Sequence, residues 1–216
     1  MATLVSFHAH PDDECIATGG VMAMAAESGH RVVLVTATRG EHGEVDDGFL
    51  DTGEELWQRR VEETEAAGKL AAILREENAD VLTVYDDNGG YGHPDHIQVH
   101  RVGLRAAELA GTPRVYQNTV NRDLMRVLAD PSSAAAPPVD IDSFGKPESE
   151  ITCAVDVRPY LSHKRAAMRA HASQISEESF FLAMPDDGFA VTFGTEWFIR
   201  AGQGPGITET DLMAGL

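Results

Sequence analysis

The stretch "HRVVLVTAT" (residues 30–38) indicates the fold class of this protein. It is a continuous apolar run rich in β-branched residues, which predicts a strand buried on both faces of a sheet. Helical patterns flank it, at residues 15–27 and in the long amphipathic segment at residues 53–77. Strands that alternate with helices of this length predict a mostly parallel sheet, with right-handed crossovers and helices on both faces.

The same alternation continues along the chain. Further strands are expected at residues 4–7, 80–86, 113–120, 151–157 and 196–200, and further helices at residues 94–110 and 159–173. We therefore expect a three-layer α/β fold made of one domain over residues 1–216, whose C-terminal portion, residues 130–216, is less regular. This portion begins with a loop rich in Pro, Ser and Ala at residues 130–150.

Composition excludes several classes of function. The formal net charge of −18 disfavours binding to nucleic acid or to anionic lipid. No apolar run approaches the roughly 20 residues that span a bilayer, and the first residues lack the basic start of a signal peptide. The two cysteines, Cys15 and Cys153, do not make a disulfide framework. These features predict a cytoplasmic protein without a membrane span or a nucleic-acid partner.

A ligand site is expected beyond the carboxyl ends of the strands, as in other open α/β sheets. Three segments should emerge there, at residues 8–14, 39–54 and 86–96, and they carry most of the titratable side chains of interest. A charge run in the second segment is typical of a solvated lid, and its Glu44 is a candidate contact for substrate. The arrangement places one candidate active site at this edge of the sheet.

The first segment contains "HPDD" (residues 10–13), in which His10 and Asp13 are three residues apart. If a helix starts near Pro11 or Asp12, this spacing brings an imidazole and a carboxylate together, and both are common zinc ligands. Asp12 then points elsewhere and remains a carboxylate that does not bind the metal. The alternative is that these aspartates simply cap the helix and complement its dipole.

The third segment contains "GGYGHPDHIQVH" (residues 89–100), which repeats the pattern. His93 and His96 are three apart at a helix start, and His96 and His100 are four apart on one helix face. A hydrolytic metal site needs three protein ligands and an open position. His10, Asp13 and one of these three histidines would supply the ligands.

The neighbouring side chains suit hydrolysis of a carbonyl compound. Asp12 could take the proton of an attacking water, acting as general base. Tyr91 or a protonated His93 could stabilise the negative charge on the oxygen. Asp95 could orient His93 and raise its pKa through its negative charge.

These residues resemble the paired signature of the LmbE-like, or PIG-L, family of metal-dependent N-deacetylases. The matching motifs are "AHPDDE" (residues 9–14), "TRGEHGE" (38–44), "RVEETEAA" (60–67), "GHPDH" (92–96) and "AHASQ" (170–174). The resemblance spans most of the chain and includes the N-acetylglucosaminyl deacetylases and the related deacetylase and amidase of the mycothiol pathway. It implies a Rossmann-like fold that does not bind a dinucleotide.

The resemblance also implies a function and roles for single residues. It implies zinc-dependent hydrolysis of a C–N amide bond in an N-acetylglucosamine-containing small molecule, with Fe²⁺ or another divalent ion as an alternative metal. By motif position, His10, Asp13 and His96 bind the metal, and Asp12 is the general base. His93 matches the residue that stabilises the oxyanion or acts as the acid, and Asp95 matches its partner. Tyr91 matches a tyrosine that some relatives use at the oxyanion, and Arg60 matches an arginine that contacts the substrate.

Two other classes of function stay open at this level. His8 and His100 leave room for a two-metal phosphoesterase, and a degenerate site would be a metal-dependent binding module without catalysis. The sequence does not determine the exact substrate, the acyl group, the physiological metal or whether the protein forms a homo-oligomer. It also gives no mechanism for His171.

Overall fold

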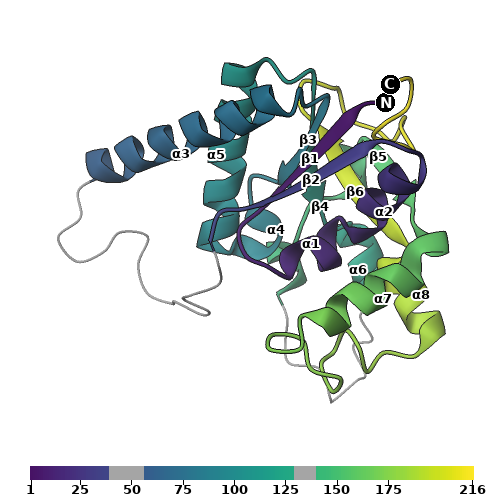
Figure 1. Ribbon diagram of the computed structural model, residues 1–216. Coiled ribbons are helices and arrows are strands. Elements are labelled where there is room, and N and C mark those ends of the chain that lie inside the picture. Colours follow the sequence, from purple (N-terminus) through teal and green to yellow (C-terminus); the bar gives the residue numbers. More distant parts are fainter. Residues whose placement is uncertain (39–55, 129–139) are drawn as a thin grey trace.

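A six-stranded sheet lies between two layers of helices (Figure 1). The computed structural model describes residues 1–38, 56–128 and 140–216, with the side chains of helix α3 described from residue 65 onward. The strand order is β2-β1-β3-β4-β6-β5. The parallel strands are β1 (Thr3–His8), β2 (Arg31–Thr36), β3 (Val81–Tyr85) and β4 (Arg114–Thr119); β6 (Thr195–Arg200) is antiparallel to β4, and β5 (Cys153–Asp156) to β6.

Helices cover both faces of this sheet. Two of them, α3 (Leu56–Glu76) and α5 (Pro94–Ala110), pack against each other over one face. On the other side lie α1 (Asp13–Ala17), α2 (Gly19–Glu27) and α7 (Leu161–Ala170). The shorter helices are α4 (Gly89–Gly92), α6 (Arg122–Leu128) and α8 (Asp186–Phe193). The predicted three-layer α/β fold with a mostly parallel sheet is confirmed.

Strand β1 shows how the two cores are divided. Its side chains alternate between the faces of the sheet, as in any strand. Val5 and Phe7 join the cluster formed with α3 and α5, whereas Leu4 joins the cluster that includes Val21 of α2. Every residue of β1 is buried, so the strand that leads into the first His-Pro-Asp motif is fixed on both sides.

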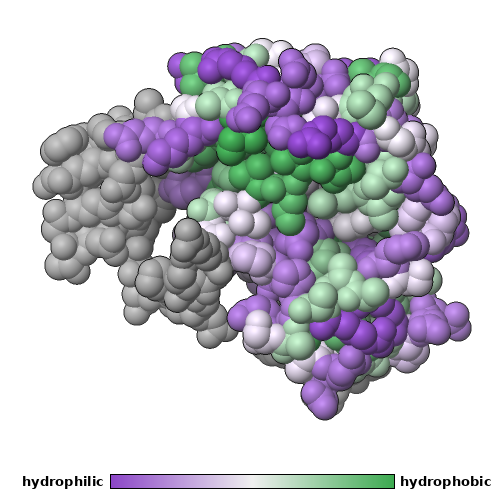
Figure 2. Space-filling model, in the orientation of Figure 1, coloured by the Kyte–Doolittle hydropathy of each residue, from purple (hydrophilic) through white to green (hydrophobic). Residues whose placement is uncertain are grey.

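Strand β2 differs from the prediction. The sheet order places it at an edge, where β1 is its only neighbour among the described strands. Its side chains are half-buried or exposed, and 43% of Leu34 is accessible. Figure 2 shows apolar side chains gathered on the face across which β2 runs in Figure 1. The prediction of a strand buried on both faces is therefore wrong, because a run of apolar residues does not reveal its place in the sheet.

The helix expected over residues 15–27 is divided at Thr18 into α1 and α2. The carboxylate of Glu196 on β6 accepts hydrogen bonds from the backbone N–H groups of Gly20 (2.7 Å) and Val21 (2.9 Å). It thereby satisfies free donors in the first turn of α2. A residue 176 positions away in the sequence caps this helix. Neither this cap nor helices α6 and α8 were predicted.

Other boundaries agree closely with the sequence. Helix α5 has the predicted bounds, whereas α7 is preceded by a 3₁₀ turn, Arg158–Tyr160, and ends before residue 173. The predicted loop at residues 130–150 contains two short turns, Ile141–Ser143 and Glu148–Glu150, and its first part lies outside the described residues. Among the described residues, no helix has the length and apolar character needed to cross a membrane.

Candidate metal centre and active site

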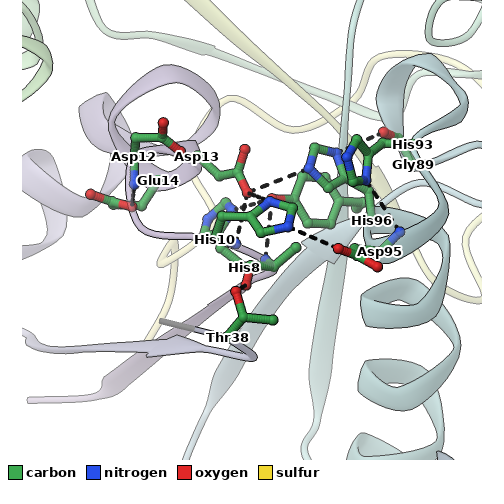
Figure 3. A network of polar contacts seen from close by, with 12 residues as sticks. His8, His10, Asp12, Asp13, Glu14, Thr38, Gly89, His93, Asp95 and His96 are labelled. Carbon is green, nitrogen blue, oxygen red and sulfur yellow. Dashed lines mark hydrogen bonds and ion pairs between the residues drawn. The ribbon is translucent and has the colours of Figure 1, made fainter. Parts of the chain in front are cut away.

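Two of the three predicted segments meet at the carboxyl ends of the paired strands β1 and β3 (Figure 3). Ligand atoms of His10, Asp13 and His96 lie within 4.8 Å of one another. The structure thus brings together the three residues that the family resemblance selected, from parts of the chain more than 80 residues apart. The segment at residues 39–54 lies outside the described residues.

Asp13 is the meeting point of these groups. It is the first residue of α1, and its Oδ2 accepts a hydrogen bond from the backbone N–H of His10 at 2.9 Å. The same oxygen lies 3.2 Å from His10 Nδ1 and 3.4 Å from His96 Nε2. The helix begins at Asp13, after the start near Pro11 or Asp12 that the spacing argument assumed, so His10 and Asp13 meet through the turn before the helix rather than along a helix face.

His96 is held in one orientation by its surroundings. Its side chain is buried, and its Nδ1–H donates to the carbonyl of Gly89 at 3.1 Å. This bond assigns a proton to Nδ1 and leaves Nε2 facing Asp13. The ring of Tyr85, the last residue of β3, stacks on the imidazole with centroids 4.1 Å apart and planes 10° apart. A histidine ring fixed in this way is oriented to bind a metal through Nε2.

Gly89 is required at its position for two reasons. Its φ is +61°, and a Cβ there would lie 2.7 Å from the Cβ of His96. Gly90 also has a positive φ (+77°), but a Cβ there would meet nothing within 4 Å. We expect Gly89→Ala to lower the free energy of unfolding by about 1–3 kcal/mol more than Gly90→Ala, measured by urea denaturation. Equal losses in the two variants would show that His96 does not need this close approach.

His10 contacts a second carboxylate. Its Nε2 lies 2.9 Å from Oδ2 of Asp95, while its Nδ1 faces Asp13. A hydrogen bond from Nε2–H to Asp95 leaves Nδ1 available as a ligand, the usual carboxylate–histidine arrangement around metals. Asp95 was predicted to orient His93. Its carboxylate instead lies on His10, and only its backbone N–H contacts His93, donating to Nδ1 at 3.2 Å.

His93 is the residue before α5 and lies beside the same cluster. Burial lowers its pKa, and the nearby His96 lowers it further; the charge of Asp95 acts in the opposite direction but does not prevail. Asp95 thus raises the pKa of His93 as predicted, but the net shift is downward, so the ring is not the protonated group that was expected. Because Nδ1 accepts from the Asp95 N–H, the neutral ring carries its proton on Nε2, which makes this atom a hydrogen-bond donor.

The electrostatics of the cluster favour a cation. Hydrogen bonding to Asp13 raises the pKa of His10 to about 9, although burial opposes this shift. Burial alone would raise the pKa of Asp13, but hydrogen bonds with His10 and His96 outweigh it and hold the pKa far below its usual value. The site thus stabilises positive charge between these side chains. Two imidazole nitrogens and a carboxylate oxygen form a donor set that suits zinc and related divalent metals.

Asp12 lies next to the cluster without joining it. Figure 3 shows Asp12 on the far side of Asp13 from His96, and Asp12 belongs to no group of three possible metal ligands among the described residues. Burial raises its pKa, and the charge of Asp13 raises it further. Tyr91 lies at the rim, 48% exposed, with its ring centroid 5.2 Å from that of His96. Burial, with the charge of Asp13, raises the Tyr91 pKa to about 12, so its hydroxyl keeps its proton.

A buried polar layer supports the cluster, and the sequence analysis missed its central member, Tyr85. The Tyr85 hydroxyl lies 3.1 Å from His8 Nδ1, and the other ring nitrogen of His8 contacts the hydroxyls of Ser6 (3.0 Å) and Thr18 (2.9 Å). Burial lowers the pKa of His8 to about 4, so this ring is neutral. The position of Tyr85 at the carboxyl end of a strand was the signal that could have identified it.

The two histidines that left room for a second metal have other partners. His8 is occupied by the hydroxyl groups of the buried layer. His100 places Nδ1 3.0 Å from the carbonyl of Tyr85. Neither belongs to any group of three ligand atoms among the described residues. Of the two predicted substrate contacts, Glu44 lies outside the described residues, and Arg60 lies on α3 where side chains are not described.

Comparison with known proteins finds relatives over nearly the whole chain. The model of the family "PIG-L: GlcNAc-PI de-N-acetylase" matches residues 5–70. The 1D-myo-inositol 2-acetamido-2-deoxy-alpha-D-glucopyranoside deacetylase of Acidothermus cellulolyticus is 33% identical, over 99% of this chain and 95% of the relative. The protein of the same name from Streptomyces avermitilis is 35% identical, over 99% and 97%. The first alignment spans 282 positions, so that relative contains internal segments without a counterpart among the 216 residues here.

Solved structures share the fold at low sequence identity. A deacetylase of teicoplanin biosynthesis has a TM-score of 0.59 and 15% identity, with 94% of this chain and all of that chain covered. The 4-carboxy-2-hydroxymuconate hydratase of Pseudomonas putida KT2440 has a TM-score of 0.53 and 15% identity, with 97% and 99% covered. Because this fold occurs with two different reactions, it does not by itself define the chemistry.

Fold, site and relatives together define a hydrolase of the deacetylase class. The chain belongs to the PIG-L, or LmbE-like, family of deacetylases. The predicted family and the predicted class of enzyme are confirmed.

Proposed function

We propose that this protein is a zinc-dependent N-deacetylase that acts on a small conjugate of N-acetylglucosamine. The observation that carries the proposal is the convergence of His10, Asp13 and His96 at one sheet edge, with Asp12 beside them. Relatives that are about one-third identical are named as deacetylases of an N-acetylglucosamine–inositol conjugate. An acetylated amino sugar joined to a polyol is therefore the substrate class we favour.

In the proposed mechanism, His10, Asp13 and His96 hold the metal. When bound, the metal lowers the pKa of a water molecule and polarises the amide carbonyl. Asp12 takes a proton from the attacking water and later delivers it to the amine that leaves. Its burial supports this role, since a raised pKa makes the carboxylate a stronger base. Acetate and the free amino sugar conjugate are the products.

The carbonyl oxygen gains negative charge when water adds, and it needs a hydrogen-bond donor. The Nε2–H of neutral His93 is suited to this role, because its other nitrogen is occupied by the Asp95 N–H. Tyr91 offers a second donor at the rim, since its hydroxyl remains protonated. Arg60 and Glu44 remain predicted contacts for the sugar conjugate.

The proposal is tested by assaying freed amines from a panel of N-acetylglucosaminides, including N-acetylglucosaminyl-inositol. Protein loaded with Zn²⁺, Fe²⁺ or Co²⁺ and metal-free protein are compared under the same conditions. We expect metal-dependent release of amine and acetate in equal amounts, highest with the inositol conjugate. Protein that binds metal but releases no amine from any member would overturn the proposal.

Asp95 provides a prediction about metal affinity. Its carboxylate orients His10, whereas its contact with His93 uses only the backbone. We expect Asp95→Ala to weaken metal binding about 10- to 100-fold, measured by competition with a chromogenic chelator. Asp187→Ala, which removes an exposed carboxylate from α8, serves as the control and should leave the affinity unchanged. Unaltered affinity in Asp95→Ala would contradict the proposed role of this contact.

The alternative functions have less support. A two-metal phosphoesterase would need more ligands near the cluster, and both His8 and His100 are engaged elsewhere. The half-buried Asp12 beside the cluster argues against a pure binding module, because a site that only holds a ligand needs no base there. Both cysteines are free and buried, which supports the proposed cytoplasmic location, where thiols stay reduced.

A further inference from the structure

The motif "AHASQ" (residues 170–174) has no part in the mechanism above, yet one of its side chains reaches the active-site turn. His171 caps the C-terminal end of α7. Its Nε2 lies 2.8 Å from Oε1 of Glu14, which is 157 residues away in the sequence. Both side chains are largely buried, with 28% of His171 and 12% of Glu14 accessible. This polar contact therefore joins the end of α7 to the first turn of α1.

The second oxygen of Glu14 leads to the proposed base. Oε2 of Glu14 accepts a hydrogen bond from the backbone N–H of Asp12 at 2.9 Å. The Glu14 carboxylate therefore bridges two groups, the His171 ring on one side and the Asp12 peptide on the other. Figure 3 shows Glu14 and Asp12 side by side, on the opposite side of Asp13 from His96.

The Asp12 backbone needs such support because it is strained. Its φ is +108° and its ψ is −32°, outside the regions that residues with a Cβ normally adopt. Conformations of this kind cost about 1–3 kcal/mol and persist only where surrounding contacts impose them. The conformation of this turn sets the direction in which the Asp12 side chain leaves the backbone. The bond from Glu14 is one contact that holds the peptide in this conformation.

We propose that His171 is a positioning residue, which fixes Glu14 and through it the turn that aims Asp12 at the reacting water. The inference rests on the proposed function of Asp12 as general base. Helix α7 is a rigid base for this contact, because its buried Lys164 lies 2.5 Å from the carboxylate of Glu196. The C-terminal portion of the chain thus contributes to a site whose other members come from its first 100 residues.

Another interpretation of the same side chains is a second metal site, since ligand atoms of Glu14, Cys15 and His171 lie within 4.8 Å of one another. The hydrogen bonds argue against it. The Cys15 thiol donates to the carbonyl of Asp12 at 2.8 Å, and both oxygens of Glu14 are engaged. Each of these groups therefore already has a hydrogen-bond partner at or near the Asp12 turn, and none of them needs a cation.

The proposal is tested first without reference to activity. Backbone NMR of the full chain would follow the Asp12 amide in wild type, His171→Ala, His171→Gln and Glu14→Ala. We expect a downfield, slowly exchanging Asp12 amide in wild type and in His171→Gln, which keeps a donor. The protection should fall at least tenfold in His171→Ala and in Glu14→Ala. An unchanged Asp12 amide in His171→Ala would overturn the proposal.

Kinetics then separate positioning from a general loss of structure. We expect His171→Ala to lower kcat about 10- to 100-fold with little change in KM, as for residues that orient active-site groups. In an Asp12→Asn background the same change should cost less than twofold. The exposed His163 on the same helix gives the control variant His163→Ala, which should match wild type. Equal losses from His171→Ala in both backgrounds would contradict action through Asp12.

Metal analysis completes the test. We expect one metal per chain in wild type and in each variant, whereas a second metal lost in His171→Ala and in Cys15→Ser would overturn the positioning role. If wild type released no amine, the proposed function would fail, but the NMR result would still show whether His171 holds the Asp12 turn.

Discussion

Replacing Asp12 by asparagine is expected to lower kcat about 10²- to 10⁴-fold, the range that general acid–base groups contribute. Asparagine has nearly the same shape, so the strained turn at φ +108° and its hydrogen bond to Glu14 should persist. It cannot take a proton from water, however. The variant should therefore keep its metal and its KM while losing turnover. Steady-state release of amine, together with metal analysis of the same preparation, measures both.

Two comparisons make this result specific. Asp13→Asn removes a charged ligand, so we expect it to lose metal as well as activity. Asp187→Asn on α8 should behave as wild type, which excludes an effect of net charge. If Asp12→Asn retained more than one-third of the wild-type kcat with full metal, Asp12 would not be the base.

Replacing Lys164 by methionine is expected to lower the free energy of unfolding by about 3–5 kcal/mol. Lys164 and Glu196 are 1% and 3% accessible, and their charged atoms lie 2.5 Å apart. Methionine fills the space but leaves the Glu196 carboxylate buried without its cation. Because Glu196 also caps α2, this helix, which follows α1, should loosen as well. Urea denaturation followed by circular dichroism measures the loss.

A matched exposed ion pair provides the control. Arg105 and Glu108 lie 2.9 Å apart on α5, with 59% and 69% of their side chains accessible. Exposed pairs contribute about 0–1 kcal/mol, so Arg105→Met should change the stability by less than 1 kcal/mol. Similar losses in Arg105→Met and Lys164→Met would show that burial does not decide the contribution of the Lys164–Glu196 pair.

The parts of the fold that depend on neighbouring residues in the sequence were predicted correctly. The bounds of α5 agree with the prediction because Pro94 suits the first turn and Gly111 adopts the left-handed conformation that ends the helix. Strand β2 was assigned correctly as a strand but misplaced in the sheet. Its neighbours come from other parts of the chain, and a run such as RVVLVT is apolar at an edge as well as in the centre.

In the candidate site, too, features that depend on local sequence were predicted correctly, whereas contacts between distant segments were not. The His-Pro-Asp motifs identified the residues that meet, since both follow strands that end at one edge of the sheet. Spacing alone could not tell His96 from His93 or His100, and the family resemblance made that choice. Asp95 was assigned to the wrong histidine. Its neighbour in sequence is His93, but its carboxylate points to His10, 85 residues away.

By itself, the sequence determined the alternation that builds a mostly parallel sheet, the donor atoms of a candidate metal site and the family to which the chain belongs. These depend on residue type and short spacing. Only the tertiary structure decided which ring nitrogen of His96 is free, what Asp95 orients, and that Glu196 caps α2. It also joined His171 to the turn of Asp12. These features are contacts between distant segments, and their geometry exists only after the sheet has brought those segments together.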